Sequence, residues 1–296
     1  MRIGHISDIH WCVTPKLSEL SPKRFLGSAN LFLRGRHRHF CRDVQSALIQ
    51  HLEQLDLDLL ICSGDLTAQS LKGEFALAKE LLSPILESVP SFLIPGNHDV
   101  YTQRAFKHHR FEEYFASWMG EPYGSIRILS EQDVTVIGLH DSCPTWISAA
   151  GHIPMDQLNA LEAFLDKEES STAFLVLCLH YPIVHRRGEI FRSRSRGLRN
   201  IDALVQVLSK AKRKPDLILH GHEHHGYEST LDAGGVSIPI MDCGSSGYAF
   251  LPKQGRYAAM NVYEVNKSKH EATFRFQFTG SKFEQIGDIS PYKEIV

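Results

Sequence analysis

Short apolar runs alternate with amphipathic segments along the first 220 residues of the chain. The runs have the length and flanking turn residues of buried strands, and they occupy residues 2–7, 58–63, 91–94, 173–179 and 216–220. Two further strands are predicted near 125–130 and 133–139. The intervening segments predict helices over residues 41–55, 70–82, 103–118, 155–167 and 200–212. This alternation of strand and helix predicts a layered α/β core.

From residue 227 onward the pattern changes to short alternating strands. We predict these strands at 227–231, 236–241, 257–265 and 272–278, in an antiparallel arrangement. Together with the first part of the chain they predict two facing sheets with helices outside. No internal repeat or low-complexity linker interrupts the sequence, so residues 1–296 are predicted to form a single domain, and the last dozen residues a loose tail.

The composition is that of an ordinary globular protein, with 43% hydrophobic and 22% charged residues. A net charge of −2 provides no general attraction to nucleic acid, so no nucleic-acid partner is expected. The six cysteines form no C-x-x-C pair, which favours a reducing, cytoplasmic setting without a disulfide framework or zinc ribbon. The first polar block begins at Asp8, so we expect no signal peptide, and no apolar run reaches the roughly 20 residues of a membrane span.

Groups typical of metal ligands recur along the chain, several of them directly after predicted strands. They come in five blocks: Asp8-Ile9-His10, Gly64-Asp65, Gly96-Asn97-His98-Asp99, His180 and Gly221-His222-Glu223-His224. Strand ends that converge on one edge of a sheet are where α/β proteins bind ligands. Two divalent ions about 3.5–4 Å apart can hold both oxygens of an in-line displacement at phosphorus. The blocks therefore predict a two-metal hydrolytic site.

The ordered pattern D-x-H, GD, GNHD, H and GHxH resembles the signature of the calcineurin-like metallophosphoesterases, and it covers residues 3 to about 250. The resemblance implies a four-layer αββα sandwich of two mixed sheets. It also implies an enzyme that hydrolyses a phosphodiester or pyrophosphate bond by attack of a metal hydroxide.

The resemblance further implies which residues hold the two ions. Asp8, His10 and His224 are expected at one ion, Asn97, His180 and His222 at the other, and Asp65 as the bridge. His98 is expected over the leaving group as a proton donor or hydrogen-bond donor, oriented by Asp65 or Asp99. The mixture of carboxylate, amide and imidazole groups without thiolate favours Mn²⁺, with Fe, Zn²⁺ or Co²⁺ as alternatives. Asp8 and His10 can reach one ion either from one face of a strand or from a tight turn after it.

Two segments do not fit the α/β alternation and are read as insertions, at about 20–40 and at 185–199. In residues 22–40, apolar side chains including Phe25 and Phe32 recur at helical spacing between basic residues. Such a helix suits a lipid substrate or peripheral contact with the inner face of a membrane. The alternative is a lid that packs on its own apolar side chains.

The segment 185–199 carries six arginines shortly after His180. Because arginine forks suit phosphate oxygens, His185, Arg186 and Arg187 are candidate substrate contacts. The alternative is a solvated run of charge.

An apolar and a basic insertion beside one site together suggest an amphiphilic phosphate compound. They resemble in character the family members that hydrolyse UDP-2,3-diacylglucosamine in lipid A synthesis, a pyrophosphate cleavage. A cyclic nucleotide or generic phosphodiester is the alternative substrate. A non-catalytic scaffold is the alternative from a different class, and the complete set of candidate ligands disfavours it.

Overall fold

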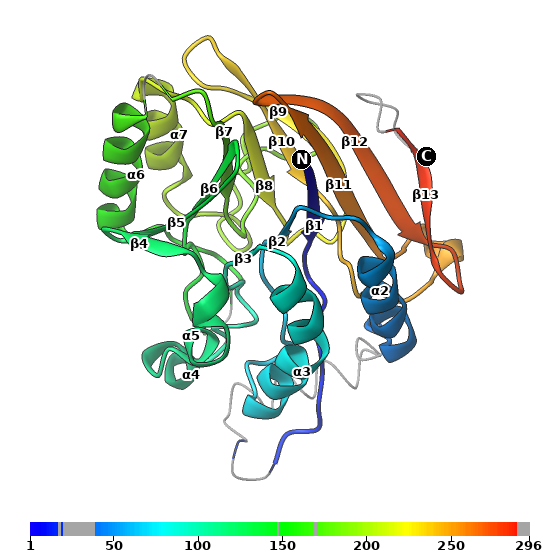
Figure 1. The fold of residues 1–296 in the computed structure, drawn as a ribbon. Helices are drawn as coiled ribbons and strands as arrows, with labels where there is room; N and C mark the ends of the chain where they lie inside the picture. Colours follow the sequence, from blue (N-terminus) through cyan, green and yellow to red (C-terminus); the bar gives the residue numbers. More distant parts are fainter. Residues whose placement is uncertain (17–18, 20–38, 147, 169–170, 289–296) are drawn as a thin grey trace.

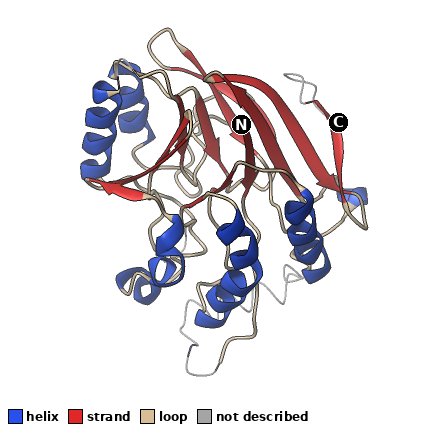
Figure 2. Cartoon of the chain, in the orientation of Figure 1, coloured by secondary structure: helices blue, strands red, loops and turns tan. Residues whose placement is uncertain are grey.

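The computed structural model describes the chain except for residues 17–18, 20–38, 147, 169–170 and 289–296. Two sheets face each other at the centre, and helices cover the outer side of each (Figure 1; Figure 2). The predicted four-layer arrangement of two mixed sheets is confirmed. Most of the insertion predicted at 20–40, including Phe25 and Phe32, lies outside the described residues, as does the end of the predicted tail.

In the described part of the chain, six strands form the first sheet in the order β13-β12-β11-β1-β2-β3. Their bounds are Arg2–Ile6 for β1, Leu59–Cys62 for β2, Ser91–Leu93 for β3, Ala259–Asn266 for β11, Lys269–Phe278 for β12 and Phe283–Asp288 for β13. Strands β1, β2 and β3 run parallel, whereas β11, β12 and β13 pair antiparallel. The predicted polar blocks at 8–10, 64–65 and 96–99 follow the three parallel strands.

The second sheet has the order β4-β5-β6-β7-β8-β10-β9 among the described strands. Their bounds are Glu121–Tyr123 for β4, Ile126–Glu131 for β5, Val134–Gly138 for β6, Phe174–Cys178 for β7, Leu217–His220 for β8, Tyr227–Asp232 for β9 and Ser237–Asp242 for β10. Strands β6, β7, β8 and β10 run parallel to one another, whereas β4, β5 and β9 pair antiparallel. The remaining two blocks, at 180 and 221–224, follow β7 and β8.

Each layer boundary buries its own apolar cluster. Ile61, Phe92 and Val176 belong to the cluster between the sheets, to which both sheets contribute. The outer face of the first sheet packs against α2 (Arg42–Gln54), α3 (Lys72–Ser88) and α5 (Arg110–Phe115). The outer face of the second sheet packs against α6 (Met155–Lys167) and α7 (Ile201–Lys210). Continuous apolar strands such as β2 and β7 are thus explained, because both of their faces are buried.

Two of the predicted helices differ from their predicted bounds by more than two residues or are broken. Helix α3 continues past Pro84 to Ser88, and the burial of Ile85 and Leu86 offsets the hydrogen bond that the proline cannot make. The helix predicted over 103–118 is instead three short elements: α4 (Gln103–Lys107), α5 and the 3-10 helix η3 (Ala116–Trp118). The break falls at His109, whose φ of 46° is left-handed and cannot continue a helix.

The C-terminal strands also differ from the predicted antiparallel tail. Strands β9 and β10 form a hairpin, but β10 pairs parallel with β8 and so extends the second sheet. Strands β11 to β13 return to the first sheet, and β13 and β4 had not been predicted. The alternation of apolar and polar side chains indicates that a segment is a strand, but it does not specify which other strand it pairs with.

Candidate metal centre

The predicted ligands lie on loops that follow parallel strands. Strand β1 ends at Ile6, so Asp8 and His10 lie in the loop beyond the strand rather than on one of its faces. Five candidate ligands have left-handed backbone, with φ of 53° at Asp8, 54° at His10, 56° at Asp65, 75° at His222 and 58° at His224. Such conformations cost roughly 1–3 kcal/mol each and concentrate at functional sites. The backbone therefore adopts these turns to direct the side chains toward one place.

Four side chains form the first ligand cluster. The ligand atoms of Asp8, His10, Asp65 and His224 all lie within 4.8 Å of one another. His224 Nε2 is 3.1 Å from Asp8 Oδ1 and 3.2 Å from His10 Nε2. Donor atoms from β1, β2 and β8 loops thus surround a single point.

Three other side chains gather beside the first cluster. His180 Nε2 lies 3.1 Å from Asn97 Oδ1, and His222 Nδ1 lies 2.8 Å from the same oxygen. These residues follow β3, β7 and β8, so both sheets contribute. The structure brings together the two ligand sets that the sequence had suggested.

Asp65 lies between the two sets. Its Oδ2 atom is 3.7 Å from His10 Nε2 and 3.5 Å from His180 Nε2. Its Oδ1 atom accepts a hydrogen bond from the backbone N–H of His98 at 2.7 Å. One carboxylate oxygen therefore faces imidazoles of both sets, which is the position a bridging ligand requires.

Backbone carbonyls orient two of the imidazoles. His180 Nδ1 lies 2.8 Å from Ser63 O, and His10 Nδ1 lies 3.3 Å from Thr67 O. A carbonyl can only accept, so each Nδ1 carries a proton, and in the neutral ring each Nε2 presents a lone pair to the site. This tautomer is the one that binds a metal ion through Nε2.

The electrostatics of the site favour a cation. Burial alone would lower the pKa of His180, but the charge of Asp65 outweighs it and raises the pKa to about 10. Burial would raise the pKa of Asp8, yet His224 and His10 hold that pKa well below its usual range. Buried carboxylates thus attract positive charge, whether as protons on imidazole or as metal ions.

The residues present fit a pair of divalent ions. Asp8 Oδ1 is buried and accepts no hydrogen bond of ordinary geometry from the described residues, although His224 Nε2 lies 3.1 Å away and a buried carboxylate oxygen normally has a partner. Carboxylate, amide and imidazole groups together suit first-row transition metals. An ion between Asp8, His10 and His224 would satisfy that oxygen.

His98 lies at the edge of the site rather than among the ligands. Its Nδ1 lies 2.6 Å from Ala68 O, so Nδ1 donates, and no described residue forms a hydrogen bond with Nε2. The ring is oriented by this carbonyl, not by the side chain of Asp65 or Asp99 as expected. Asp99 instead accepts backbone N–H groups of Leu66, Thr67 and Gly96. Burial lowers the pKa of His98 to about 4, with Asp65 opposing the shift.

Three glycines of the motifs are required by close packing. A Cβ at Gly64, whose φ is 106°, would lie 2.5 Å from the backbone nitrogen of Gly96. A Cβ at Gly96 would overlap the carboxylate of Asp65, and one at Gly221 would overlap Ser7 Oγ and Asp8 Oδ2. These glycines let the loops approach the carboxylates.

Asp141 belongs to the support of the site, and the sequence reasoning missed it. Its Oδ2 atom accepts the backbone N–H groups of His180 at 3.1 Å and Tyr181 at 2.8 Å. Its position in the sequence could have indicated this role. Asp141 follows β6, which runs parallel to β7, just as the five motif blocks follow parallel strands.

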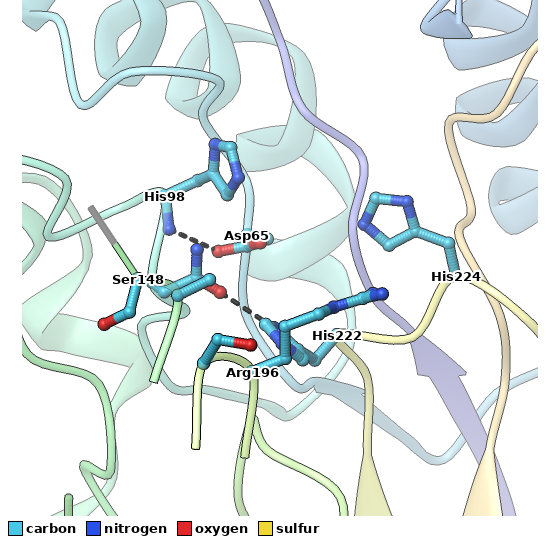
Figure 3. A pocket seen from close by; sticks show the side chains of 9 residues that line it. Asp65, His98, Ser148, Arg196, His222 and His224 are labelled. Carbon is cyan, nitrogen blue, oxygen red and sulfur yellow. Dashed lines mark hydrogen bonds between the residues drawn. The ribbon is translucent and has the colours of Figure 1, made fainter. Parts of the chain in front are cut away.

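The candidate ligands open into a pocket of about 380 Å³ (Figure 3). Its lining residues are Asp65, Asn97, His98, Ser148, Ala149, Ser195, Arg196, His222 and His224. Of the arginine segment, Arg196 and Ser195 reach this pocket. Arg186 and Arg187 are exposed and His185 stacks on Phe191, and none of the three lines the pocket. Their role in substrate binding stays a prediction, as does that of Phe25 and Phe32.

Comparison with known proteins gives related sequences with phosphodiesterase names. A sequence profile described as calcineurin-like phosphoesterase matches residues 1–226. A "Probable cyclic nucleotide phosphodiesterase" of Vesicomyosocius okutanii is 26% identical over 205 residues, which are 69% of this chain and 76% of that protein. A "Probable glycerophosphodiester phosphodiesterase" of Arcobacter nitrofigilis is 31% identical over 147 residues, which are 48% of this chain and 50% of that protein.

Solved structures share the fold. A purple acid phosphatase from yellow lupin seeds superposes with a TM-score of 0.56 at 14% identity, covering 96% of this chain and 52% of that one. A 5'-nucleotidase precursor from Thermus thermophilus gives a TM-score of 0.52 at 9% identity, covering 96% and 54%. The chain spans about half the length of these structures.

Proposed function

Because the chain belongs to the calcineurin-like phosphoesterase family, it is a metal-dependent phosphoester hydrolase, and we propose that its substrate is a small phosphodiester such as a cyclic nucleotide. The observation that carries this proposal is the position of Asp65 Oδ2 between His10 and His180. A carboxylate there can hold two ions at the spacing that in-line displacement at phosphorus requires. When bound, the ions would supply Lewis acidity and lower the pKa of water.

The chain's own residues would divide the work as follows. Asp8, His10 and His224 would hold one ion, Asn97, His180 and His222 the other, and Asp65 both. We propose Mn²⁺ as the first candidate metal. Asp141, through the backbone of His180, and Ser63 and Thr67, through their carbonyls, would keep the imidazoles oriented.

His98 would act at the leaving group. Its Nδ1–H donates to Ala68 O, so its Nε2 carries a proton only in the imidazolium form. That form can donate both a hydrogen bond and a proton to a departing alkoxide. A bound phosphate anion nearby would favour it over the neutral ring.

The pocket supports a diester of small size. Its described lining is largely polar, with histidine, serine, aspartate and one arginine. The Vesicomyosocius okutanii relative, which matches more of this chain, is named for cyclic nucleotides. The Arcobacter nitrofigilis relative is named for glycerophosphodiesters, so a glycerol-bearing diester is the second candidate substrate. Neither relative is named for UDP-2,3-diacylglucosamine, and the apolar segment that suggested that substrate lies outside the described residues. No described helix is long and apolar enough to cross a membrane.

A substrate panel with defined metals tests the proposal. The protein would be stripped with a chelator, reloaded with Mn²⁺, Zn²⁺, Fe²⁺ or Co²⁺, and assayed on cyclic AMP, glycerophosphocholine, bis-p-nitrophenyl phosphate and p-nitrophenyl phosphate. We expect metal-dependent turnover with higher kcat/KM on diesters than on the monoester. The Asp65→Asn variant controls for contaminating activity. A clear preference for the monoester would contradict the proposal.

A further inference from the structure

One arginine of the basic segment lies in the wall of the metal-centre pocket. Arg196 lines the same pocket as Asp65, Asn97 and His98, and it is the one lysine or arginine among the described lining residues. Its side chain is 58% exposed, so a molecule in the pocket can reach it. Figure 3 shows the side chain extending past His222 toward the side of His224. The cation therefore faces the space that a substrate would fill.

A carboxylate beside the candidate ligands holds the guanidinium. Arg196 Nη2 lies 3.2 Å from Glu223 Oε1, and Glu223 is the residue between His222 and His224 in the last motif. The side chain of Glu223 is only 15% exposed. A guanidinium has five N–H donors, so a contact with one carboxylate oxygen leaves donors for a second anion.

The backbone that carries Arg196 is tied to the opposite loop of the pocket. Ala149 N donates to Ser195 O at 2.7 Å, Gly151 N to Gly197 O at 3.1 Å, and Arg199 N to Gly151 O at 3.0 Å. Ala149 itself lines the pocket. These hydrogen bonds fix the backbone from which the Arg196 side chain extends relative to the pocket.

Another arginine of the segment provides a contrast. Arg192 pairs with Asp202 at 2.6 Å, both side chains are largely exposed, and neither lines the pocket. The two arginines share a segment and an ion pair, but only one of them faces the metal centre. Their positions in the fold therefore distinguish the two arginines, although both belong to the same arginine-rich segment.

We propose that Arg196 is a substrate-binding residue that binds a non-bridging phosphate oxygen, and that Glu223 is its positioning residue. The inference rests on the proposed phosphodiesterase function. The metal ions would attract the substrate phosphate, and the Arg196 guanidinium would add a directional contact to it. This second contact would align the phosphodiester for displacement.

Kinetics of matched variants test this role. The metal-loaded wild type, Arg196→Gln, Arg196→Lys and the control Arg192→Gln would be assayed on bis-p-nitrophenyl phosphate. Losing a hydrogen bond between charged groups should lower kcat/KM of Arg196→Gln by about 10–100-fold. Arg196→Lys should fall between it and the wild type, and Arg192→Gln should match the wild type. If Arg196→Gln behaves like Arg192→Gln, the inference is wrong.

Phosphate binding gives a readout that does not need turnover. Inorganic phosphate would be titrated calorimetrically into each metal-loaded protein, with metal content and Tm measured on the same samples. We expect Arg196→Gln to bind phosphate about 10–100-fold more weakly with both metals retained. Loss of metal from this variant would overturn the inference, because the arginine would then act on the metal centre. Wild type that binds phosphate through Arg196 but hydrolyses no diester would instead contradict the proposed function.

The role of Glu223 is separable by a double variant. If Glu223 acts by holding Arg196, Arg196→Gln with Glu223→Gln should be no worse in kcat/KM than Arg196→Gln alone. Glu223→Gln by itself should weaken phosphate binding while both metals remain. Fully additive losses would show that Glu223 does not act through Arg196.

Discussion

Asp141 holds His180 through its backbone, with Oδ2 3.1 Å from the nitrogen of that residue. The same oxygen accepts the N–H of Tyr181 at 2.8 Å. The turn after β7 is therefore fixed by a buried carboxylate from the neighbouring strand, and the imidazole of His180 starts from a defined position.

Removing the Asp141 carboxyl should destabilise the protein. Asp141→Ala leaves two buried N–H groups without an acceptor, which should lower the free energy of unfolding by about 2–5 kcal/mol. Asp141→Asn keeps an acceptor oxygen and should be more stable than Asp141→Ala. Chemical denaturation of the metal-free proteins measures both values. Equal stability of Asp141→Ala and Asp141→Asn would show that these bonds contribute little.

The same residue should give a pH-dependent difference in stability. Burial raises the pKa of Asp141 to about 6, above its ordinary value of 3.8. A carboxyl with a raised folded-state pKa contributes stability that is present below its unfolded pKa and lost as the pH rises through its folded pKa. The stability of Asp141→Asn relative to wild type should therefore be greatest above pH 6 and shrink as the pH falls toward 4. A difference independent of pH would contradict the assignment.

Asp65 should govern metal content. Asp65→Asn can still accept the N–H of His98, so the loop should stay folded. It removes the charge between His10 and His180, and kcat/KM should fall by at least about 100-fold, since even outer-shell changes cost 10–100-fold. Elemental analysis should find fewer than two metals per chain. Asp58→Asn, at an exposed carboxylate that accepts Arg2 N–H, is the control.

His98 should act on the leaving group and not on metal binding. His98→Ala should keep both metals and lower kcat about 10²–10⁴-fold on a diester with an alkoxide leaving group, and much less with p-nitrophenolate. Burial lowers the pKa of His98 to about 4, so the cationic form grows as the pH falls. The ratio of wild-type to variant rates should therefore rise from pH 8 toward pH 5. The exposed His108→Ala is the matched control, and metal loss from His98→Ala would make His98 a ligand.

Gly221 should be irreplaceable although it carries no side chain. A Cβ there would overlap Asp8 Oδ2 and Ser7 Oγ. Gly221→Ala should therefore displace the Asp8 carboxylate and weaken metal binding, which chelator competition measures. Gly73→Ala is the control, because its added Cβ meets only Val13 Cγ2 at 3.2 Å and alanine favours a helix. Equal metal affinity in both variants would contradict the packing argument.

Much of the fold was contained in local patterns. Strands β2 and β7 and helix α6 lie where apolar runs and helical spacing predicted them, because side-chain periodicity depends only on near neighbours. The break at His109 and the continuation of α3 past Pro84 were not predicted. The part of α3 beyond Pro84 buries Ile85 and Leu86, and that burial depends on residues distant in sequence.

The sequence by itself determined the kinds of ligand, their order and their place after strands, and so the family and its chemistry. Only the tertiary structure decided which groups meet. Parallel pairing of β6 with β7 brings Asp141 under His180, and the tie between residues 149–151 and 195–199 places Arg196, not Arg186 or Arg187, in the pocket. These contacts join residues far apart in sequence. A motif records the chemistry each residue can perform, whereas the order and direction of strands in the sheets set the distances between residues.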